Sequence, residues 1–276
     1  MIVFLNGKFV PEEQATVSVF DRSFSLSDGL FETLPVHNGR LFLWDKHFER
    51  LNAGAVFLKI KILFSAEAIR SFAEELLGKN QASEGMLRIH LSRGIGVRGY
   101  SARGADSPTL VITLHPFRKI PALCKVVTSS FRIPANDPLS KFKTCSKLSY
   151  VLARTEADER GADEALLLNT DGNIAEATSS NLFWVEGETV CTPPLDSGAL
   201  PGVTREFILK ICAELKIITV EKNISPETLA HIESAFLTSS GVGVREISHV
   251  DGRELSRSAI TQQLRDAYLS YAEGAH

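Results

Sequence analysis

Residues 116–121 read Pro-Phe-Arg-Lys-Ile-Pro, and this stretch divides the sequence into two parts. It interrupts a dense pattern of apolar residues, and few residues typical of a protein core lie across it. A chain of 276 residues is long enough for two domains of ordinary size. We therefore predict an N-terminal domain over residues 1–117, a linker over residues 118–121 and a C-terminal domain over residues 122–276.

On the N-terminal side of this stretch, turn signals are followed by helical periodicity. Asn6-Gly7 and Asn38-Gly39 each lie between short apolar runs, and both positions of such a dipeptide tolerate the positive φ of a two-residue hairpin turn. The pattern predicts strands at 2–4, 8–10, 31–36, 40–43, 86–92 and 109–114, and helices at 45–58 and 65–77.

On the C-terminal side, several short strands are interrupted by helices. Strands are predicted at 125–130, 164–168, 181–185, 189–191 and 234–238, and helices at 146–160, 204–215 and 256–271. The order of elements is mixed and is not a strict alternation of strand and helix. The sequence therefore predicts an α+β fold (mixed α/β) with two domains, in preference to a doubly wound parallel sheet.

The composition excludes several classes of protein. Hydrophobic residues make up 44% of the chain and charged residues 23%, which is typical of a globular core and excludes disorder. The net charge of −3 gives no reason to expect a nucleic-acid partner, and the apolar runs are far shorter than the ~20 residues of a membrane helix. Cys124, Cys145, Cys191 and Cys212 form no CxxC pair, so we expect reduced thiols, a cytoplasmic location and no metal site.

Three segments carry groups suited to binding an anion. Arg50 shares a helix face with His47. Residues 202–205 open a predicted helix, whose free N–H groups and Thr204 hydroxyl suit a phosphate, and residues 238–241 could add hydroxyl and N–H donors. Each segment also has a purely structural interpretation, as a solvated arginine, a capped helix start and a polar turn, and the residues alone leave both interpretations open.

A fourth segment offers candidates for covalent chemistry. A lysine that forms a Schiff base needs a neutral, nucleophilic amine. Lys141 and Lys143 alternate along an extended stretch and point the same way, so spacing alone does not choose between them. A buried carboxylate such as Glu176 could hold a pyridine nitrogen protonated, which makes the ring an electron sink. Together the four segments indicate a phosphate, a Schiff base and a pyridinium.

Longer motifs follow one another in a fixed order: the hairpin at Asn6-Gly7, DGLFET at 28–33, His47-x-x-Arg50-Leu51, Lys143, GADEA at 161–165, EATSSNLF at 176–183 and GVTR at 202–205. In these motifs the chain resembles the class IV aminotransferases, over essentially its whole length. These are two-domain pyridoxal-phosphate enzymes of fold type IV, with an architecture like that of D-amino-acid aminotransferases. The resemblance implies pyridoxal 5′-phosphate as the cofactor, an enzyme, and a homodimer.

The resemblance also implies roles for individual residues. The family's interval between lysine and glutamate favours Lys143 over Lys141 as the Schiff-base lysine, with Glu176 as the partner of the pyridine nitrogen. Two positions depart from the pattern. Leu148 stands where some relatives have a tyrosine that touches the ring oxygen of the cofactor, and Ser27 stands where glycine is usual. The expected phosphate contacts are Arg50, Val203, Thr204 and Ser240.

Residues 88–101 are expected to select the substrate. Arg88 and His90 alternate onto one face of a strand, and Arg93 and Arg98 lie in the loop that follows. Arginine binds carboxylates through a planar, bidentate fork, so three arginines within eleven residues indicate a small-molecule ligand with carboxylate groups. The alternative is a solvated basic loop.

The motif RGYS at 98–101 is similar to that of 4-amino-4-deoxychorismate lyases, as is ADEAL at 162–166. These lyases form 4-aminobenzoate and pyruvate, a step toward folate. The resemblance therefore favours this lyase, with Tyr100 and Glu32 added to the expected substrate contacts, although some lyases have threonine at the position of Glu32. D-amino-acid aminotransferases grip the substrate with an arginine and a histidine of the equivalent loop, so transamination is the alternative. A non-catalytic cofactor-binding paralogue is opposed by the retention of both the lysine and the glutamate.

Overall fold

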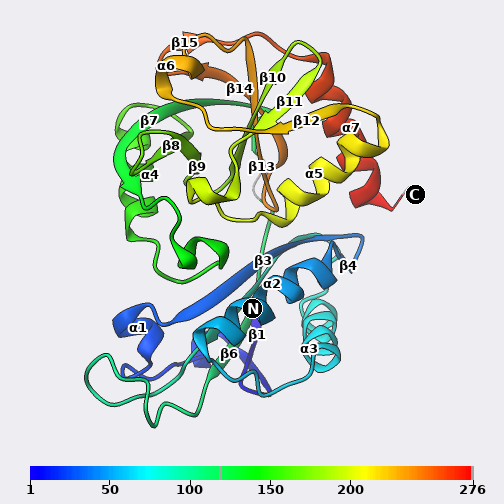
Figure 1. The fold of residues 1–276 in the computed structure, drawn as a ribbon. Helices are drawn as coiled ribbons and strands as arrows, with labels where there is room; N and C mark the ends of the chain where they lie inside the picture. The colour runs from blue at the N-terminus through cyan, green and yellow to red at the C-terminus, as the bar shows by residue number, and fades with distance from the viewer. Residues whose placement is uncertain (118–119, 275–276) are drawn as a thin grey trace. The chain divides into compact units, whose positions relative to one another are not determined.

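The computed structural model describes residues 1–117 and 120–274, and these form two compact units (Figure 1). The first unit contains residues 1–117 together with Phe142–Ser146, and the second contains the other described residues. Of the predicted linker at 118–121, the first two residues lie outside the described residues. The predicted assignment of residues 122–276 to a single domain has one exception, because Phe142–Ser146 pack in the first unit.

The first unit is built on a six-stranded sheet in the order β2-β1-β6-β5-β3-β4. Its strand pairs are antiparallel. The predicted hairpins at Asn6-Gly7 and Asn38-Gly39 are confirmed, since these turns join β1 to β2 and β3 to β4. The elements are β1 (Ile2–Leu5), β2 (Lys8–Pro11), η1 (Glu12–Gln14), α1 (Arg22–Leu26), β3 (Gly29–His37), β4 (Arg40–Leu41), α2 (Trp44–Leu58), α3 (Ala66–Lys79), β5 (Gly85–Ser92) and β6 (Thr109–His115).

Helices α2 and α3 contribute the side chains that close the core of this unit. Leu51 of α2 and Ile69 of α3 belong to one buried apolar cluster with Phe4 of β1. The helical spacing of apolar residues therefore identifies the buried faces correctly. Gly54 of α2 lies against Leu30 of β3, where a Cβ atom would come within 2.9 Å of a Leu30 methyl group. Glycine at this position lets the helix approach the strand closely.

The second unit is built on a nine-stranded sheet with the path β12-β11-β10-β13-β14-β7-β8-β9, and β15 pairs with β14. Parallel pairs occur at β11/β12, β14/β7 and β7/β8. The elements are β7 (Leu123–Ile133), η2 (Pro138–Lys141), α4 (Leu148–Glu159), β8 (Glu164–Asn169), β9 (Ile174–Ala177), β10 (Asn181–Glu186), β11 (Thr189–Thr192), η3 (Leu195–Ser197), α5 (Val203–Glu214), β12 (Ile218–Glu221), α6 (Pro226–Leu229), β13 (Ser234–Ser239), β14 (Gly243–Val250), β15 (Arg253–Glu254) and α7 (Ala259–Glu273).

Helix α4 packs on β7 and β8, and α5 and α7 pack against each other (Figure 1). The mixed order of strands and helices confirms the expected α+β class. Strand β14 was not predicted, because two of its buried residues are charged. Arg245 and Glu246 are accommodated there by ion pairs with Asp163 and Arg257. None of the described helices has the length and apolar character needed to cross a membrane.

Candidate active site

Residues 142–146 form an extended segment at the edge of β3, in the part of that edge that β4 does not cover. The Phe31 amide donates to the Lys143 carbonyl at 3.0 Å, and the Cys145 amide donates to the Gly29 carbonyl at 2.9 Å. The segment is therefore antiparallel to β3. Because side chains alternate along strands, Lys143 and Cys145 lie on the same face of the sheet as Phe31.

Predicted site residues gather on this face of the sheet. His90 of β5 lies opposite Phe31 in the register, and Arg88 lies two residues away on the same face. Lys143 Nζ is 4.7 Å from the centre of the Phe31 ring, and the guanidinium carbon of Arg88 is 4.1 Å from it. Cys145 Sγ is 3.8 Å from His90 Nε2. The structure therefore brings Lys143, Arg88 and His90 together around Phe31.

The two lysines that spacing could not separate lie in different units. Lys143 is partly buried on the face just described. Lys141 is exposed and ends η2 of the second unit. The charge of Lys143 is also felt inside the first unit, because burial, and then the charges of Arg50 and Lys143, lower the pKa of His47. Only Lys143 thus lies beside the other predicted residues of the first unit.

Glu32 is buried and holds Arg50 and His47. The Arg50 Nε and Nη2 atoms each donate to one Glu32 carboxylate oxygen at 2.8 Å, and His47 Nδ1 lies 2.7 Å from Oε2. Burial alone would raise the pKa of Glu32, but Arg50 and His47 outweigh it and lower the pKa to about 2. Glu32 is therefore an anion that fixes the guanidinium of Arg50. Its expected contact with the substrate stays a prediction.

The loop after β5, in which the sequence predicts substrate contacts, is organised by Asp28. Arg93 binds the Asp28 carboxylate with Nε at 2.8 Å and Nη2 at 3.0 Å, and also donates to the carbonyls of Leu58 and Lys59. Arg22 donates to the same carboxylate at 2.8 Å. Although burial raises the pKa of Asp28, Arg93 and Arg22 lower it overall. The guanidinium of Arg93 is thus engaged within the protein.

Arg22 is a residue that the sequence analysis missed. Its guanidinium donates to the carbonyls of three consecutive residues, Gly99, Tyr100 and Ser101, at 3.0–3.1 Å. Arg22 therefore fixes the backbone of the RGYS motif. Within the described part of the chain, the side chains of Arg98 and Tyr100 are exposed and have no hydrogen-bond partner. The structure does not bring these two side chains to the face that carries Lys143.

In the second unit, Glu176 of β9 is buried among hydrogen-bond donors. Its Oε1 accepts from the Tyr150 hydroxyl at 2.9 Å. Its Oε2 accepts from the Leu200 amide at 3.0 Å and lies 3.4 Å from the Asn181 side-chain amide. Tyr150 was missed, although it is the one tyrosine in the sequence between Lys143 and Glu176.

The start of α5 forms the second part of the site in this unit. Gly202 is its N-cap and offers no side-chain hydrogen bond to the first turn, whose amide groups have no acceptor within the helix. Val203 and Thr204 open the helix and are both buried. Nearby in the sheet, the buried Oγ1 of Thr238 on β13 has no hydrogen-bond partner among the described residues. Ser240 follows in the turn after β13.

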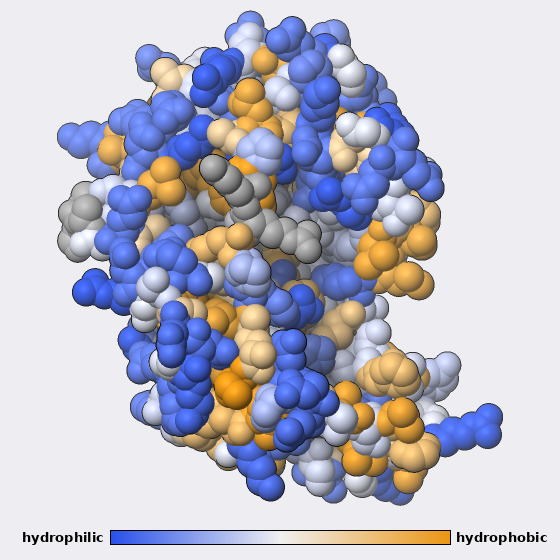
Figure 2. All heavy atoms as spheres, turned by 180° about the vertical axis from the view of Figure 1, so that it is seen from behind, coloured by the Kyte–Doolittle hydropathy of each residue, from blue (hydrophilic) through white to orange (hydrophobic). Residues whose placement is uncertain are grey.

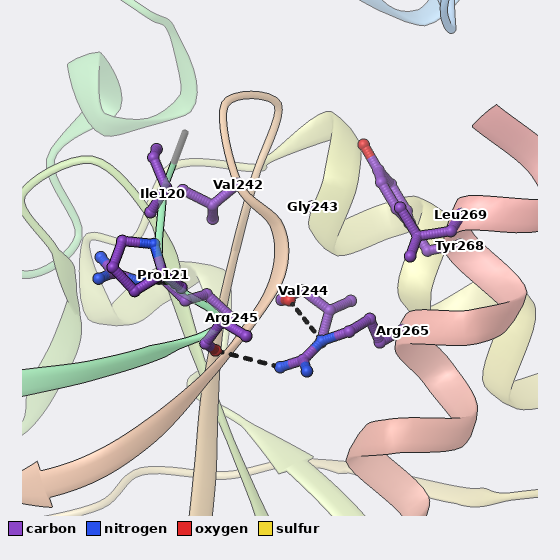
Figure 3. A pocket seen from close by; sticks show the side chains of 10 residues that line it. Ile120, Pro121, Val242, Gly243, Val244, Arg245, Arg265, Tyr268 and Leu269 are labelled. Carbon is purple, nitrogen blue, oxygen red and sulfur yellow. Dashed lines mark hydrogen bonds between the residues drawn. The ribbon is translucent and has the colours of Figure 1, made fainter. Parts of the chain in front are cut away.

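A cavity of about 160 Å³ in the second unit is lined by residues that include none of the predicted site residues (Figure 3). Arg265 at its wall donates to the carbonyls of Val244 and Ala122, at 3.1 and 3.2 Å. Its connection to the site is Tyr268, which lines the cavity and forms a hydrogen bond with the Thr204 side chain. Tyr268 therefore supports the start of α5 from α7.

Comparisons with known proteins agree along most of the chain. A family model described as amino-transferase class IV matches residues 29–250. The chain is 30% identical over 243 residues to an aminodeoxychorismate lyase of Bacillus subtilis (strain 168), and the aligned region covers 87% of this chain and 83% of the relative. It is 28% identical over 262 residues to a D-alanine aminotransferase of Bacillus licheniformis, and the aligned region covers 94% of this chain and 92% of the relative.

Among solved structures, the chain is similar to a branched-chain aminotransferase of the archaeon Thermoproteus uzoniensis, with a TM-score of 0.92 and 29% identity. That match covers 99% of this chain and 95% of the other. The likeness over nearly the whole of both chains confirms the expected architecture. It does not separate the three activities that these relatives carry.

Proposed function

This chain belongs to the class IV aminotransferase family and is a pyridoxal-phosphate enzyme, and from this premise we propose that it acts as a 4-amino-4-deoxychorismate lyase. That reaction releases pyruvate and forms 4-aminobenzoate, on the route to folate. The observation that carries the proposal is Arg88, which lies on the face that carries Lys143 and forms no ion pair within residues 1–117 and 120–274. We propose that Arg98, whose exposed side chain is not on that face, acts in the active site of the other subunit of a homodimer. The lyase substrate carries two carboxylates, and each needs a cation.

Arg88 is the arginine best suited to one of these carboxylates. It lies on the same face as Lys143, and stacking on Phe31 leaves its N–H fork available for a bidentate contact. We assign Arg93 to the structure of the loop, because Asp28 and two carbonyls occupy its guanidinium. Burial, and then the charge of Arg88, lower the pKa of His90, which favours the neutral imidazole before a carboxylate binds.

The residues of the chain fit the chemistry of pyridoxal phosphate. The amides at the start of α5 and the partnerless Thr238 hydroxyl are donors suited to a phosphate. When bound, the cofactor supplies an electron sink for the electron pair that stays on the amino-bearing carbon after a proton leaves. We propose that the following residues hold it: Lys143 covalently, Glu176 at the ring nitrogen, and Arg50, Val203, Thr204 and Ser240 at the phosphate.

The protein's own part in the reaction is orientation and one proton transfer. Lys143 takes the proton from the amino-bearing ring carbon and returns a proton to the leaving enolpyruvyl group. The carbon–oxygen bond to that group breaks, pyruvate departs and the ring becomes aromatic. No oxidant or keto-acid acceptor is needed. Because aromatisation makes this elimination strongly downhill, holding both carboxylates in place is the main task of the arginines.

Transamination is the second candidate function. It is supported by the similarity to D-alanine aminotransferase and to branched-chain aminotransferase, at identities close to that of the lyase. A transaminase needs a cation for the carboxylate of each amino acid that it binds, and Arg88 could supply it. The same lysine, glutamate and phosphate contacts are required, so the proposal for the cofactor site stands under both functions.

Three parallel incubations of the purified enzyme distinguish the activities. The first contains aminodeoxychorismate without any keto acid, the second D-alanine with 2-oxoglutarate, and the third L-leucine with 2-oxoglutarate. The lyase proposal requires release of pyruvate and 4-aminobenzoate in the first incubation. Absence of pyruvate there, with amino transfer in the second or third, would replace the lyase by a transaminase.

We also propose a homodimer. Apolar side chains are exposed together at one end of the first unit, where α1 and the loop after β5 are joined by hydrogen bonds (Figure 2). Such a patch is typical of a protein–protein interface. We call this patch the α1 surface, and its residues are Val19, Phe20, Phe24, Ile95, Val97 and Tyr100.

We also propose a cytoplasmic location, which is consistent with the absence of a disulfide bond among the described cysteines.

A further inference from the structure

Tyr150 and Glu176 form a direct hydrogen bond in the second unit, in which the tyrosine hydroxyl donates to Oε1 at 2.9 Å. We infer that Tyr150 is a positioning residue, which holds the Glu176 carboxylate in the orientation that the cofactor's ring nitrogen requires. This inference rests on the proposed role of Glu176. Tyr150 lies in the first turn of α4 and Glu176 lies on β9, so the contact ties the helix to the strand.

The hydrogen bond from Tyr150 is part of a set that engages both oxygens of Glu176. The Leu200 amide and the Asn181 side chain approach the other oxygen, at 3.0 and 3.4 Å. These donors are all neutral, so they orient the carboxylate without neutralising its charge. The Asn181 side chain is itself fixed, because it donates to the Leu200 carbonyl at 2.8 Å.

The surroundings of Tyr150 keep its hydroxyl protonated, so that it donates to Glu176. Its ring packs on the buried cluster that contains Ala153 and Leu167. The Lys147 ammonium group lies 4.3 Å from the ring centre. Burial, and then the adjacent Glu176 charge, raise the pKa of Tyr150 far above its ordinary value. The hydroxyl therefore keeps its proton across the working pH range.

Removal of the Tyr150 hydroxyl should raise the basicity of the Glu176 carboxylate. A carboxylate that loses a donor becomes a stronger base. The proton shared between Glu176 and the ring nitrogen would then move toward the carboxylate, and the ring would lose pyridinium character. Because a hydrogen bond to a charged group is worth enough to change a rate by one to two powers of ten, we expect Tyr150→Phe to lower kcat by about tenfold to a hundredfold, with little change in KM.

A spectroscopic measurement tests the inference without relying on turnover. The holoenzyme is reconstituted with pyridoxal phosphate labelled with nitrogen-15 in the ring, and the protonation of the ring nitrogen is read from its NMR chemical shift. The matched control is Tyr271→Phe, because the Tyr271 hydroxyl also donates to a glutamate, Glu214, at 2.7 Å in an exposed position. Glu176→Gln serves as the reference for complete loss of the carboxylate.

The expected result is a shift toward the unprotonated ring in Tyr150→Phe, a larger one in Glu176→Gln and none in Tyr271→Phe. If Glu176→Gln moves the signal and Tyr150→Phe leaves both the signal and kcat unchanged, the inference on Tyr150 is overturned and the role of Glu176 stands. If Glu176→Gln leaves the signal unchanged, the proposed function of Glu176 is overturned, and the inference falls with it. A loss of thermal stability alone in Tyr150→Phe would mean a purely structural role.

Discussion

Arg50 and Glu32 form a bidentate ion pair inside the first unit, with two N–H···O contacts of 2.8 Å each. The Glu32 side chain is only 1% exposed, so its charge depends on this partner and on His47. Arg50 in turn has a fixed guanidinium, since a bidentate pair permits one orientation. A rigid cation of this kind suits the proposed contact with a phosphate.

The pair makes the stability of the first unit dependent on pH. Burial opposes the charge of Glu32, but Arg50 and His47 lower its pKa to about 2 from the ordinary value of 4.5. A carboxyl group with a lowered pKa in the folded state stabilises the fold above pH 4.5, and this contribution is lost as the pH falls from 4.5 toward 2. The difference of 4.5 − 2 corresponds to about 3 kcal/mol in the free energy of unfolding.

Glu32→Gln removes this contribution and tests it. Urea titrations of both proteins should give a variant that is less stable at pH 7, with a gap that narrows as the pH falls below 4.5. A gap that stays constant from neutral to acidic pH would show that the pKa of Glu32 is the same in the folded and unfolded states, which contradicts the lowered pKa.

Lys143→Ala is expected to abolish the long-wavelength absorbance band of lysine-bound pyridoxal phosphate and to remove activity. The reason is that Lys143 lies with Arg88 and His90 on one face of the sheet, whereas Lys141 ends an exposed 3-10 helix in the other unit. Lys141→Ala is the matched control and should keep the band. The assignment would have to be reversed if Lys141→Ala lost the band and Lys143→Ala kept it.

Substitution of Arg88 should weaken substrate binding, whereas substitution of Arg93 should lower the stability of the fold. Arg88→Gln removes a cation that has no acidic partner within the described residues, so KM should rise by tenfold or more while the melting temperature changes little. Arg93→Gln breaks a part-buried pair with Asp28 and two bonds to carbonyls, so it should lower the free energy of unfolding by about 3 kcal/mol. Steady-state kinetics and thermal melts on both variants separate the roles, and the opposite pattern would exchange them.

Phe24→Asp should weaken the proposed homodimer. Phe24 is 75% exposed on the α1 surface, and an aspartate at the centre of an apolar interface would be left unpaired. Sedimentation velocity should show a dimer for the unaltered protein and a monomer for this variant. The control is Ile218→Asp, which changes another exposed apolar residue, on β12 of the second unit. If the unaltered protein sediments as a monomer, the homodimer is refuted directly.

The sequence predicts features that depend on neighbouring residues better than features that depend on residues far apart in the chain. The Asn-Gly hairpins and the amphipathic helices depend on neighbours in the sequence, so spacing was sufficient to find them. Periodicity cannot show which distant strand an extended segment joins. Residues 142–146 were therefore expected in the C-terminal domain, yet their backbone pairs with Gly29 and Phe31 more than a hundred residues away.

The same limit explains which site residues were missed. Arg22 donates hydrogen bonds to the carbonyl groups of residues 99–101. Every residue has a backbone carbonyl group, so a sequence pattern does not show which of them a side chain will bind. Tyr150 lies two positions after Leu148, where the resemblance drew attention to a missing tyrosine. Leu148 is exposed, and the tyrosine of this helix instead contacts Glu176. Its partner could be identified only from the fold.

Gly202→Ala should damage the phosphate end of the site through sterics alone. The backbone of Gly202 has φ −67° and ψ 133°, which alanine adopts without strain. A Cβ atom there, however, would lie 2.0 Å from Asn181 Oδ1. Asn181 would have to move and release its bond to the Leu200 carbonyl. We expect an overpacking cost of about 1–3 kcal/mol in the free energy of unfolding, together with roughly tenfold weaker binding of pyridoxal phosphate.

Gly78→Ala is the matched control, because Gly78 lies in α3, and a Cβ atom there would meet nothing within 4 Å. It should stabilise the protein by about 0.5–1 kcal/mol through helix propensity and leave cofactor binding unchanged. Urea unfolding of the apoprotein and titration of its absorbance with pyridoxal phosphate measure both effects. If Gly202→Ala bound the cofactor as tightly as the unaltered protein, the position of the Asn181 side chain would have no effect on cofactor binding at the start of α5. The proposed phosphate contacts at Val203 and Thr204 would then lose this support.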